Sequence, residues 1–446
     1  MLKINPSIFK GYDIRGIYPE EINEDVFYRI GAAFCEYLNQ KKNFGPVILG
    51  RDARLSSLAL AEAFSRGIID QGRDIIDIGL TTTPLFYFSF NFSKAAGGAM
   101  ITASHNPAEF NGLKLLREGG WPIYKKDGLS EVAILAASET GRKIRAGKAD
   151  KKDFSREYLD FLKKYARIQK PLKIVSDASN GSAGPVLKKL FESLNIEAAE
   201  LFFEPDGAFP NHSPNPLLPE AQRPVKEKVK ETGADLGFIV DADGDRIIFV
   251  DEKGESVDSN SVYAFLLDNF LAKGDLILMA VSASKIIEDI AAKKGARWQR
   301  ITVGHANFKS AMRLKNARFG GEPSGHFHFR DFYDFDSALL TLVHVLSLVS
   351  QKNEAFSEIL KPYRKYFNSG ELNFKIANPS EAIERLKKEY AGGRQSLADG
   401  LTVEYDDWWF NIRASQTEPL VRLVIEAKTK ELLEEKIKLV LSSVKI

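Results

Sequence analysis

The segment "LKIVSDASNGSAGPVLKKLFESLN" (172–195) contains the pattern that decides the fold class. An apolar run at its start predicts a buried strand, the Gly- and Ser-rich stretch predicts a turn, and the amphipathic remainder predicts a helix. The same order recurs along the chain, with helices interspersed between strands that we expect at 46–50, 74–79, 236–240, 275–281 and 297–304. This alternation predicts an α/β protein whose mainly parallel sheets are covered by helices on both faces.

The last part of the chain follows a different pattern. Residues 400–415 and 419–429 predict strands, and a helix is expected from about Lys430, which together indicate a small α+β domain. The chain of 446 residues exceeds the about 250–300 residues that one hydrophobic core holds, so several domains are expected. The basic stretch 139–153 indicates the first linker. We expect domains at 1–148, 149–250, 251–367 and 368–446.

The composition argues against several function classes. The net charge of +2 gives no general tendency to bind nucleic acid or membrane surfaces. No apolar run approaches the about 18 residues of a membrane span, and the N-terminal segment lacks the charged-then-apolar order of a signal peptide. The single cysteine, Cys35, cannot form an internal disulfide. We therefore expect a cytoplasmic protein without nucleic-acid or membrane partners.

Three aspartates directly follow the strand expected at 236–240. Asp241, Asp243 and Asp245 alternate in "DADGDR", which can turn three carboxylates toward one cation, and oxygen ligands favour Mg²⁺ or Ca²⁺ over zinc. An EF-hand is the rival interpretation, because Glu252 stands at the twelfth position, but Arg246 occupies the position where that loop needs glycine. Close, unpaired aspartates repel one another, which disfavours a purely structural role. The loop is a candidate metal site.

A serine loop follows another apolar run, in "GGAMITASHNPAEFNGLKL" (97–115). Ser104 stands between an alanine and His105 on a loop that proline stiffens. A serine hydroxyl is a weak nucleophile and needs a base, a metal or prior modification. Neighbouring side chains often point apart, so the segment by itself fits either a reactive serine or a polar turn.

Two more polar loops are candidates for ligand binding. In "RFGGEPSGHFHF" (318–329), the short polar side chains of Glu322, Ser324 and His326 suit the hydroxyls of a sugar or polyol, although a polar turn explains them too.

The second of these loops is "NIRASQTEPLVR" (411–422). Arg413 can make bidentate contacts with a phosphate, and Ser415, Thr417 and backbone N–H groups can complete the binding site. Arg422 adds charge or lies on a strand face.

Taken together, these loops resemble the α-D-phosphohexomutases, the phosphoglucomutase/phosphomannomutase superfamily. The family order is T-A-S-H-N-P, D-x-D-x-D-R, G-E-x-S-G-H and R-x-S-N-T-E-P, which appears here at 102–107, 241–246, 321–326 and 413–419. Three further segments look like family signatures: "FKGYDIRG" (9–16), "GRDAR" (50–54) and "TVGHANFK" (302–309). The resemblance covers almost the whole chain. It implies three related α/β domains with mixed sheets and a smaller C-terminal α+β domain around a central cleft.

The resemblance also implies a mechanism. Ser104 matches the family serine that carries a phosphoryl group and donates it to a hexose phosphate, giving a hexose 1,6-bisphosphate, which is also the expected activator. Mg²⁺ would be bound by Asp241, Asp243, Asp245 and the phosphorylated Ser104. Arg15, Arg246, Lys114 and His305 match catalytic positions, the first two for charge stabilisation and the others for proton transfer. The matched binding positions are Tyr12, Lys309, Glu322, Ser324, His326, Arg413, Ser415 and Thr417.

Some positions depart from the family pattern and leave the substrate open. Gln416 replaces the usual asparagine, which puts a direct phosphate contact by this residue in doubt. Pro323 stands where phosphomannomutases often have methionine and phosphoglucosamine mutases often have glutamine. We expect a mutase for mannose or glucose phosphates. The alternatives are a phosphoglucosamine mutase and a catalytically silent sugar-phosphate-binding protein; the sequence leaves monomer and dimer equally open.

Overall fold

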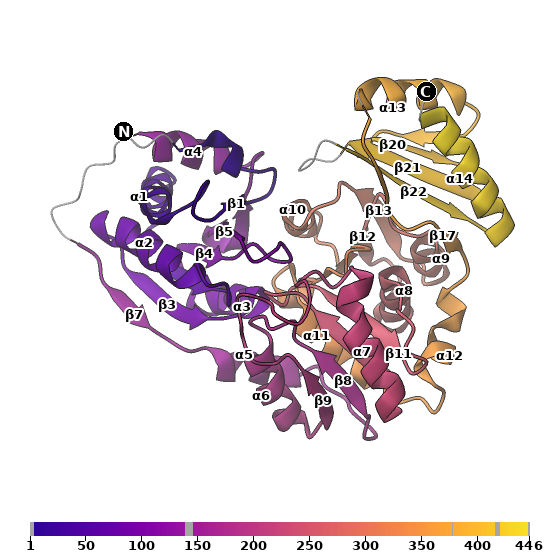
Figure 1. Cartoon of the computed structure of the whole chain (residues 1–446), viewed down its shortest axis with the longest axis horizontal. Coiled ribbons are helices and arrows are strands. Elements are labelled where there is room, and N and C mark those ends of the chain that lie inside the picture. Colours follow the sequence, from indigo (N-terminus) through magenta and orange to yellow (C-terminus); the bar gives the residue numbers. More distant parts are fainter. Residues whose placement is uncertain (1–3, 139–145, 377, 415–419, 445–446) are drawn as a thin grey trace. The chain divides into compact units, whose positions relative to one another are not determined.

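The computed structural model describes residues 4–138, 146–376, 378–414 and 420–444 (Figure 1). The chain divides into two compact units. The first extends to Val257 and includes Ser324–Ser357, and the second comprises Asp258–Pro323 and the part from Glu358 onward. The boundary between Pro323 and Ser324 therefore falls inside the predicted sugar-binding loop.

The first unit begins with a seven-stranded mixed sheet. The sheet order is β1 (Ile14–Ile17), β5 (Phe110–Arg117), β4 (Gly97–Ile101), β2 (Val47–Arg51), β3 (Ile75–Leu80) and β7 (Ala149–Lys151), with β6 (Trp121–Ile123) paired to β5. Strands β4, β2, β3 and β7 run parallel, whereas β1, β5 and β6 pair in antiparallel fashion.

Helices cover both faces of this sheet (Figure 1). One face forms a core with α1 (Glu24–Gln40), α2 (Ser57–Asp70) and α4 (Leu129–Ala137). Helix α3 (Thr83–Ser93) lies on the other face, where a Cβ added at Gly98 of β4 would meet its rings Phe86 and Phe90. Because strands β4, β2, β3 and β7 run parallel, the loops that follow them emerge at the same edge of the sheet.

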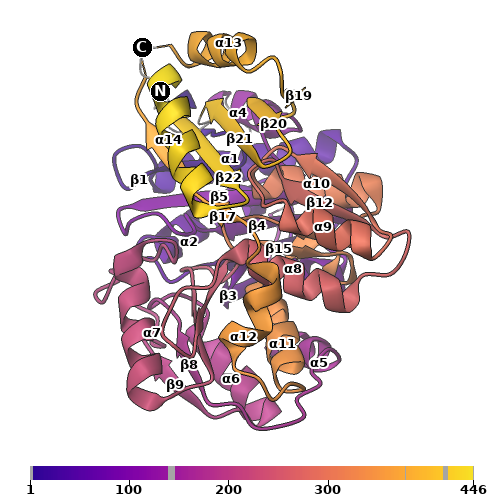
Figure 2. The same ribbon diagram turned by 90° about the vertical axis from the view of Figure 1, so that its right-hand side faces the viewer.

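A second, four-stranded sheet belongs to the same unit. Its order is β11 (Ile247–Asp251), β10 (Leu236–Val240), β8 (Ile174–Asp177) and β9 (Ala198–Leu201), and only β11 is antiparallel. Helix α7 (Pro219–Thr232) packs on the face that includes Ile239, and α6 (Gly184–Leu194) packs through Phe191 against Phe238 on the opposite face. Figure 2 shows α7 alongside β8 and β9. The remaining elements of this unit are α5 (Ser155–Lys163), β15 (Phe327–Phe329), β16 (Phe335–Asp336) and α11 (Ala338–Val349).

The second unit contains a parallel and an antiparallel sheet. In the parallel sheet β12 (Leu276–Ala280) lies between β13 (Arg297–Ile301) and β14 (Phe319–Gly321), with α8 (Ser259–Phe270), α9 (Ile286–Lys293) and α10 (His305–Lys315). The antiparallel sheet has the order β17 (Phe367–Asn368), β22 (Val421–Ala427), β21 (Trp408–Ala414), β20 (Leu401–Glu404) and β19 (Arg394–Ser396), with β18 (Leu372–Phe374) paired to β22. Helices α13 (Pro379–Glu389) and α14 (Lys430–Val444) pack with it.

The short helices are η1 (Pro6–Ile8), η2 (Glu118–Gly120), η3 (Arg330–Phe332), α12 (Phe356–Leu360) and η4 (Lys361–Tyr363).

The predicted alternation of strands and helices is confirmed, and so is the change of pattern in the C-terminal part. The linker expected at 139–153 is wrong in its last part, because β7 within it pairs with β3 in the first sheet. Helices α3 and α11 were not predicted, because nearly all their residues are buried and the sequence shows no polar face.

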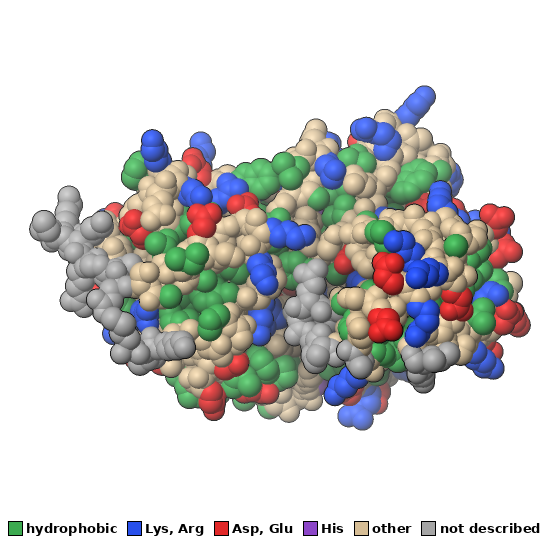
Figure 3. Space-filling model, turned by 90° about the horizontal axis from the view of Figure 1, so that it is seen from above, with side chains coloured by type: hydrophobic (Ala, Val, Ile, Leu, Met, Phe, Trp, Pro, Cys, Tyr) green, Lys and Arg blue, Asp and Glu red, His purple; other side chains and the backbone are tan. Residues whose placement is uncertain are grey.

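Two observations bear on the excluded function classes. Within the described residues, no helix is both long and apolar enough to span a membrane. On the face drawn in Figure 3, Lys and Arg side chains are interspersed with Asp and Glu side chains, as the near-neutral net charge predicts.

Candidate active site

The predicted serine loop connects β4 to β5 and brings Ser104 to the acidic loop. Ser104 is only 3% exposed, has a left-handed φ of +51°, and donates its backbone N–H to Oγ1 of Thr102 at 2.8 Å. Its hydroxyl donates a hydrogen bond to Oδ2 of Asp241 at 2.9 Å, and Nδ1 of His105 lies 3.3 Å away. The two loops lie 137 positions apart in sequence, and each follows the carboxyl end of an interior strand, β4 or β10.

The three aspartates of the acidic loop turn toward one another after β10. Asp241, Asp243 and Asp245 are at most 1% exposed, and one carboxylate oxygen from each lies within 4.8 Å of the others. Oδ1 of Asp241 accepts the backbone N–H groups of Asp245 at 3.0 Å and Arg246 at 3.1 Å. The strand at 247–251 confirms that the segment is not an EF-hand.

Helix α3, which packs on the first sheet, also contacts the acidic loop. Thr83 donates its hydroxyl to Oδ2 of Asp243 at 2.6 Å and its backbone N–H to the carbonyl of the same residue at 2.8 Å. Sequence reasoning missed Thr83, because nothing in the local pattern of α3 indicates a partner in the second sheet.

Burial and crowding shift the pKa values of the carboxylates in opposite directions. Burial, then the charges of Asp245 and Asp243, raise the pKa of Asp241 well above its usual value. Burial also acts to raise the pKa of Asp243, but the charge and hydrogen bond of Lys114 hold it well below its usual value. The ammonium of Lys114 lies 2.7 Å from Asp243 Oδ2 and 2.6 Å from Asp245 Oδ2. Burial acts to lower the pKa of Lys114, but the charges of Asp243 and Asp245 raise it well above its usual value.

The carboxylate cluster fits a divalent cation. Oδ1 of Asp243 and Oδ1 of Asp245 are buried and have no hydrogen-bond partner among the described residues. An acceptor in that state is costly unless a cation or a donor satisfies it. An all-oxygen set of carboxylates is the donor chemistry that Mg²⁺ prefers.

Three cationic side chains of the first unit surround this cluster. Besides Lys114 on β5, Arg15 on β1 donates to Oδ1 of Asn106 at 2.6 Å and to Asp13 at 2.5 Å, and its buried Nε has no partner among the described residues. Arg246 donates from Nε to Nε2 of His326 at 3.0 Å. The site therefore has positive groups against both the serine loop and the acidic loop.

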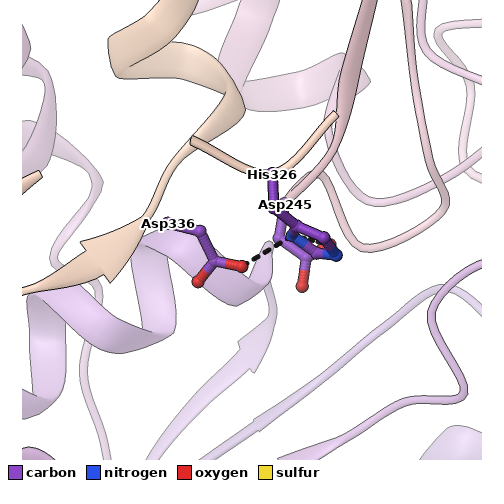
Figure 4. A group of neighbouring side chains, drawn as sticks. All are labelled: Asp245, His326 and Asp336. Atoms are coloured by element: carbon purple, nitrogen blue, oxygen red, sulfur yellow. Dashed lines mark ion pairs between the residues drawn. The ribbon is translucent and has the colours of Figure 1, made fainter. Parts of the chain in front are cut away.

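His326 is oriented by an aspartate that the sequence analysis did not identify. Nδ1 of His326 lies 2.7 Å from Oδ2 of Asp336 and 3.7 Å from Oδ1 of Asp245 (Figure 4). Nε2 of the ring accepts the hydrogen bond from Arg246, and Nδ1 faces the Asp336 carboxylate at close range. Asp336 ends β16 and belongs to no motif, so no local signal could have identified it.

The buried ring of His105 lies near the same positive groups. Burial, followed by the charge of Arg246, lowers the pKa of His105 well below its usual value. The ring is therefore neutral at pH 7, and its protonated form is disfavoured.

The remaining predicted residues of the first unit are Tyr12 and Ser324, and both are half-buried. Tyr12 lies two residues before the start of β1, and Ser324 lies three residues before the start of β15.

The other predicted residues lie in the second unit. Oε2 of Glu322 accepts the backbone N–H of Gly304 at 3.1 Å, which ties the sugar loop to the start of α10. On that helix, Nζ of Lys309 lies 3.0 Å from Nδ1 of His305. Two segments predicted separately, 302–309 and 321–326, are therefore neighbours.

The predicted phosphate loop is described only in part. Arg413 on β21 is 3% exposed, donates to Oδ1 of Asn411 at 3.1 Å and forms an ion pair with Glu371, a partner that the sequence analysis missed. Arg422 also pairs with Glu371, at 2.9 Å. Ser415, Gln416 and Thr417 lie outside the described residues.

Family models match four successive parts of the chain. They are described as domains I, II and III, each alpha/beta/alpha, and the C-terminal domain of phosphoglucomutase/phosphomannomutase, and they match residues 6–142, 156–254, 258–366 and 371–439.

Curated relatives and solved structures match over nearly the full length. A protein of Xanthomonas campestris pv. campestris named "Phosphohexose mutases" is 40% identical, over 94% of this chain and 95% of its own. A phosphomannomutase of Salmonella montevideo is 38% identical, over 96% and 99%. The crystal structure of a phosphoglucomutase/phosphomannomutase family protein of Burkholderia thailandensis aligns with a TM-score of 0.90 and 31% identity, over 99% of this chain and 98% of that one.

Proposed function

The chain belongs to the phosphoglucomutase/phosphomannomutase family and is a phosphohexomutase, and from this premise we propose that Ser104 carries the phosphoryl group it transfers. The observation that supports this role best is the 2.9 Å hydrogen bond from the Ser104 hydroxyl to Asp241, within a buried set of three carboxylates and surrounding cations. Transfer would run between hexose 1-phosphates and hexose 6-phosphates through a hexose 1,6-bisphosphate.

In the first half-reaction, the bond between phosphorus and Ser104 Oγ breaks, a bond from phosphorus to the sugar hydroxyl oxygen forms, and the proton that this hydroxyl loses is balanced by the proton that Ser104 Oγ takes up. In the second, Ser104 Oγ attacks the other phosphate of the bisphosphate and loses its proton, the bond from phosphorus to the sugar oxygen breaks, and that oxygen takes up a proton. Oδ2 of Asp241 accepts the hydrogen bond of the serine hydroxyl, and Nδ1 of His105 lies 3.3 Å from Oγ.

We propose Mg²⁺ as the cation, bound by Asp241, Asp243 and Asp245 together with the phosphorylated Ser104. When bound, it supplies positive charge against the phosphoryl oxygens during transfer. Lys114, Arg15 and Arg246 add positive charge from the protein itself, and Lys114 with His305 are our candidates for proton exchange with the sugar hydroxyls. The buried Nε of Arg15 is one donor that a phosphate oxygen would satisfy.

We assign sugar binding to Glu322, Ser324 and His326, with Tyr12 and Lys309 as further contacts. We assign the non-reacting phosphate to Arg413, Ser415 and Thr417; Glu371 would release part of the Arg413 guanidinium when a phosphate binds. Mannose and glucose phosphates are the proposed substrates, because the similar proteins include a phosphomannomutase and one named for phosphohexoses. We also propose the four domain limits expected from the sequence, which limited proteolysis tests.

A coupled assay tests the proposal. Mannose 1-phosphate, glucose 1-phosphate and glucosamine 1-phosphate are supplied in parallel, with Mg²⁺ and a trace of glucose 1,6-bisphosphate as activator. We expect turnover of the first two sugars, none in Ser104→Ala, and full turnover in Ser396→Ala, whose serine is exposed on β19. Turnover that persists in Ser104→Ala would overturn the role of Ser104, and a preference for glucosamine 1-phosphate would overturn the proposed substrates.

A further inference from the structure

The segment "GRDAR" (50–54) has no role in the mechanism above, yet its last residue lies directly behind Ser104. The Arg54 side chain is 0% exposed, and its guanidinium is held by Asp52, also 0% exposed, at 3.1 Å. A charged group so deeply buried is costly unless all its donors are satisfied. The structure satisfies all of them.

The Arg54 guanidinium donates to the backbone of the serine loop. Its N–H groups reach the carbonyl oxygens of Ser104 at 2.7 Å, Asn106 at 2.6 Å, Pro107 at 2.5 Å and Phe110 at 3.0 Å. With the bond from Nε to Asp52, all five N–H donors of the side chain are used. One planar group thus fixes four peptide carbonyls within seven consecutive residues.

This clamp constrains the backbone at Ser104. Ser104 has a φ of +51°, a left-handed conformation that a residue other than glycine adopts only when its surroundings hold it there. Its N–H is bound by Thr102 and its carbonyl by Arg54, so both neighbouring peptide groups are constrained. The direction of the Ser104 Cα–Cβ bond, and with it the reach of Oγ toward Asp241, follows from those constraints.

Asp52 and Phe209 hold the clamp itself. Oδ1 of Asp52 accepts the hydroxyl of Ser57 at 2.5 Å and the backbone N–H of Arg54 at 3.0 Å, which ties it to the start of α2. From the second sheet, the loop after β9 covers Arg54, with the ring of Phe209 5.1 Å from the guanidinium carbon. Gly207 permits this approach, since a Cβ there would lie 2.4 Å from the carbonyl of Ala53.

We propose that Arg54 is a positioning residue, clamped by Asp52 and Phe209, that sets the serine loop so that Ser104 Oγ faces the acidic loop. The inference rests on the proposed role of Ser104 as the phosphoryl carrier. Lysine cannot replace the clamp, because its single ammonium lacks the planar fork that spans several acceptors. A displacement of the nucleophile by about 1 Å costs on the order of a hundredfold in rate.

The test compares Arg54→Lys with Arg73→Lys. Arg73 is a matched control, because it is also buried in the first unit and binds a backbone carbonyl, that of Gly45 at 2.9 Å, in a segment well removed in sequence from the serine loop. Both variants retain the charge. The readouts are kcat and KM with mannose 1-phosphate, and the single-turnover rate at which glucose 1,6-bisphosphate phosphorylates Ser104.

For Arg54→Lys we expect kcat and the phosphorylation rate to fall about a hundredfold while KM changes less than about threefold. For Arg73→Lys both rates should stay within about twofold of wild type, whatever its thermal stability. A folded Arg54→Lys protein with a wild-type phosphorylation rate would overturn the inference. If instead Ser104→Ala keeps mutase activity, the proposed function itself fails, and the two failures are distinct.

Phe209→Leu covers the case in which Arg54→Lys does not fold. This variant retains all five guanidinium hydrogen bonds and removes only the ring that faces them. We expect kcat to fall about three- to tenfold at unchanged KM, since the clamp loses one of its two supports. A kcat equal to that of wild type in folded Phe209→Leu would then overturn the inference.

Discussion

The Lys114 ammonium is the positive charge in closest contact with the acidic loop, and removing it gives the sharpest test of the site's electrostatics. Its side chain is 6% exposed and bridges two carboxylates that are 0% and 1% exposed, at 2.7 and 2.6 Å. Breaking a buried pair by removal of one partner costs about 3–5 kcal/mol, because the other charge stays buried and uncompensated. We expect Lys114→Met to lose that much stability when EDTA keeps the cluster free of divalent cations.

Scanning calorimetry measures this loss. At about 2–4 °C per kcal/mol for a unit of this size, the transition of the first unit should shift down by about 6–20 °C. Added Mg²⁺ should recover part of the loss, since it brings positive charge to the same carboxylates. Lys148→Met is the control: Lys148 pairs with Asp150 at 3.0 Å on the surface, and its loss should leave the transition unchanged within error.

A second variant separates charge from packing. In Lys114→Met combined with Asp243→Asn, one of the two uncompensated carboxylates is also neutral, so the double variant should be more stable than Lys114→Met alone. If Lys114→Met melts within about 2 °C of wild type in EDTA, the cluster is not held together by this ion pair and the reasoning is refuted.

Three other predictions concern the same unit. Asp336→Asn removes the negative charge 2.7 Å from Nδ1 of His326, the ring that accepts from Arg246, so kcat should fall about tenfold with KM nearly unchanged; an equal kcat would show that this contact does not matter. Treatment with EDTA should abolish turnover and lower the melting temperature, and Mg²⁺ should restore both, whereas activity that survives complete chelation would contradict the metal site. The buried pair of His212 and Asp177, 3.2 Å apart, should make stability depend on pH. Burial acts to lower the pKa of His212, but the hydrogen bond and charge of Asp177 raise it overall. The stabilisation from this pair is therefore complete below the unfolded-state pKa of about 6.5 and is lost as pH rises through the higher folded-state pKa. The melting temperature of His212→Gln should consequently fall less than that of wild type between about pH 6 and 9.

The sequence predicts the order of elements and two of the loops that make the site. Alternating strands and helices imply parallel strands, and loops that follow parallel strands emerge at the same sheet edge. For this reason the residue pattern alone indicates that Ser104, after β4, and Asp241, after β10, both lie on loops at strand ends. Their hydrogen bond agrees with the roles that the two motifs suggest.

The partners of these residues could not be predicted, because they come from distant segments and carry no local pattern. Thr83 begins an apolar helix, and Asp336 ends a two-residue strand. Arg54 belongs to a recognised motif, but the motif does not say what its side chain contacts. Only the structure gives its four carbonyl acceptors, since a backbone oxygen leaves no trace in the residue types.

The contact between Ser104 and Asp241 also indicates why the site needs so much positive charge. In the unphosphorylated form the serine donates to the carboxylate, and the pair is favourable without any cation. Phosphorylation removes that donor and places about −1.5 to −2 charges beside three buried aspartates. The protein's own contribution against this repulsion is Lys114, Arg15 and Arg246. Lys114 already pairs with Asp243 and Asp245, Arg246 lies 3.8 Å from Asp241, and Arg15 pairs with Asp13 outside the cluster. If Ser104 is the phosphoryl carrier that we propose, a divalent cation at the carboxylates would matter more to the phosphorylated form than to the free serine, and the metal site would be coupled to the state of Ser104.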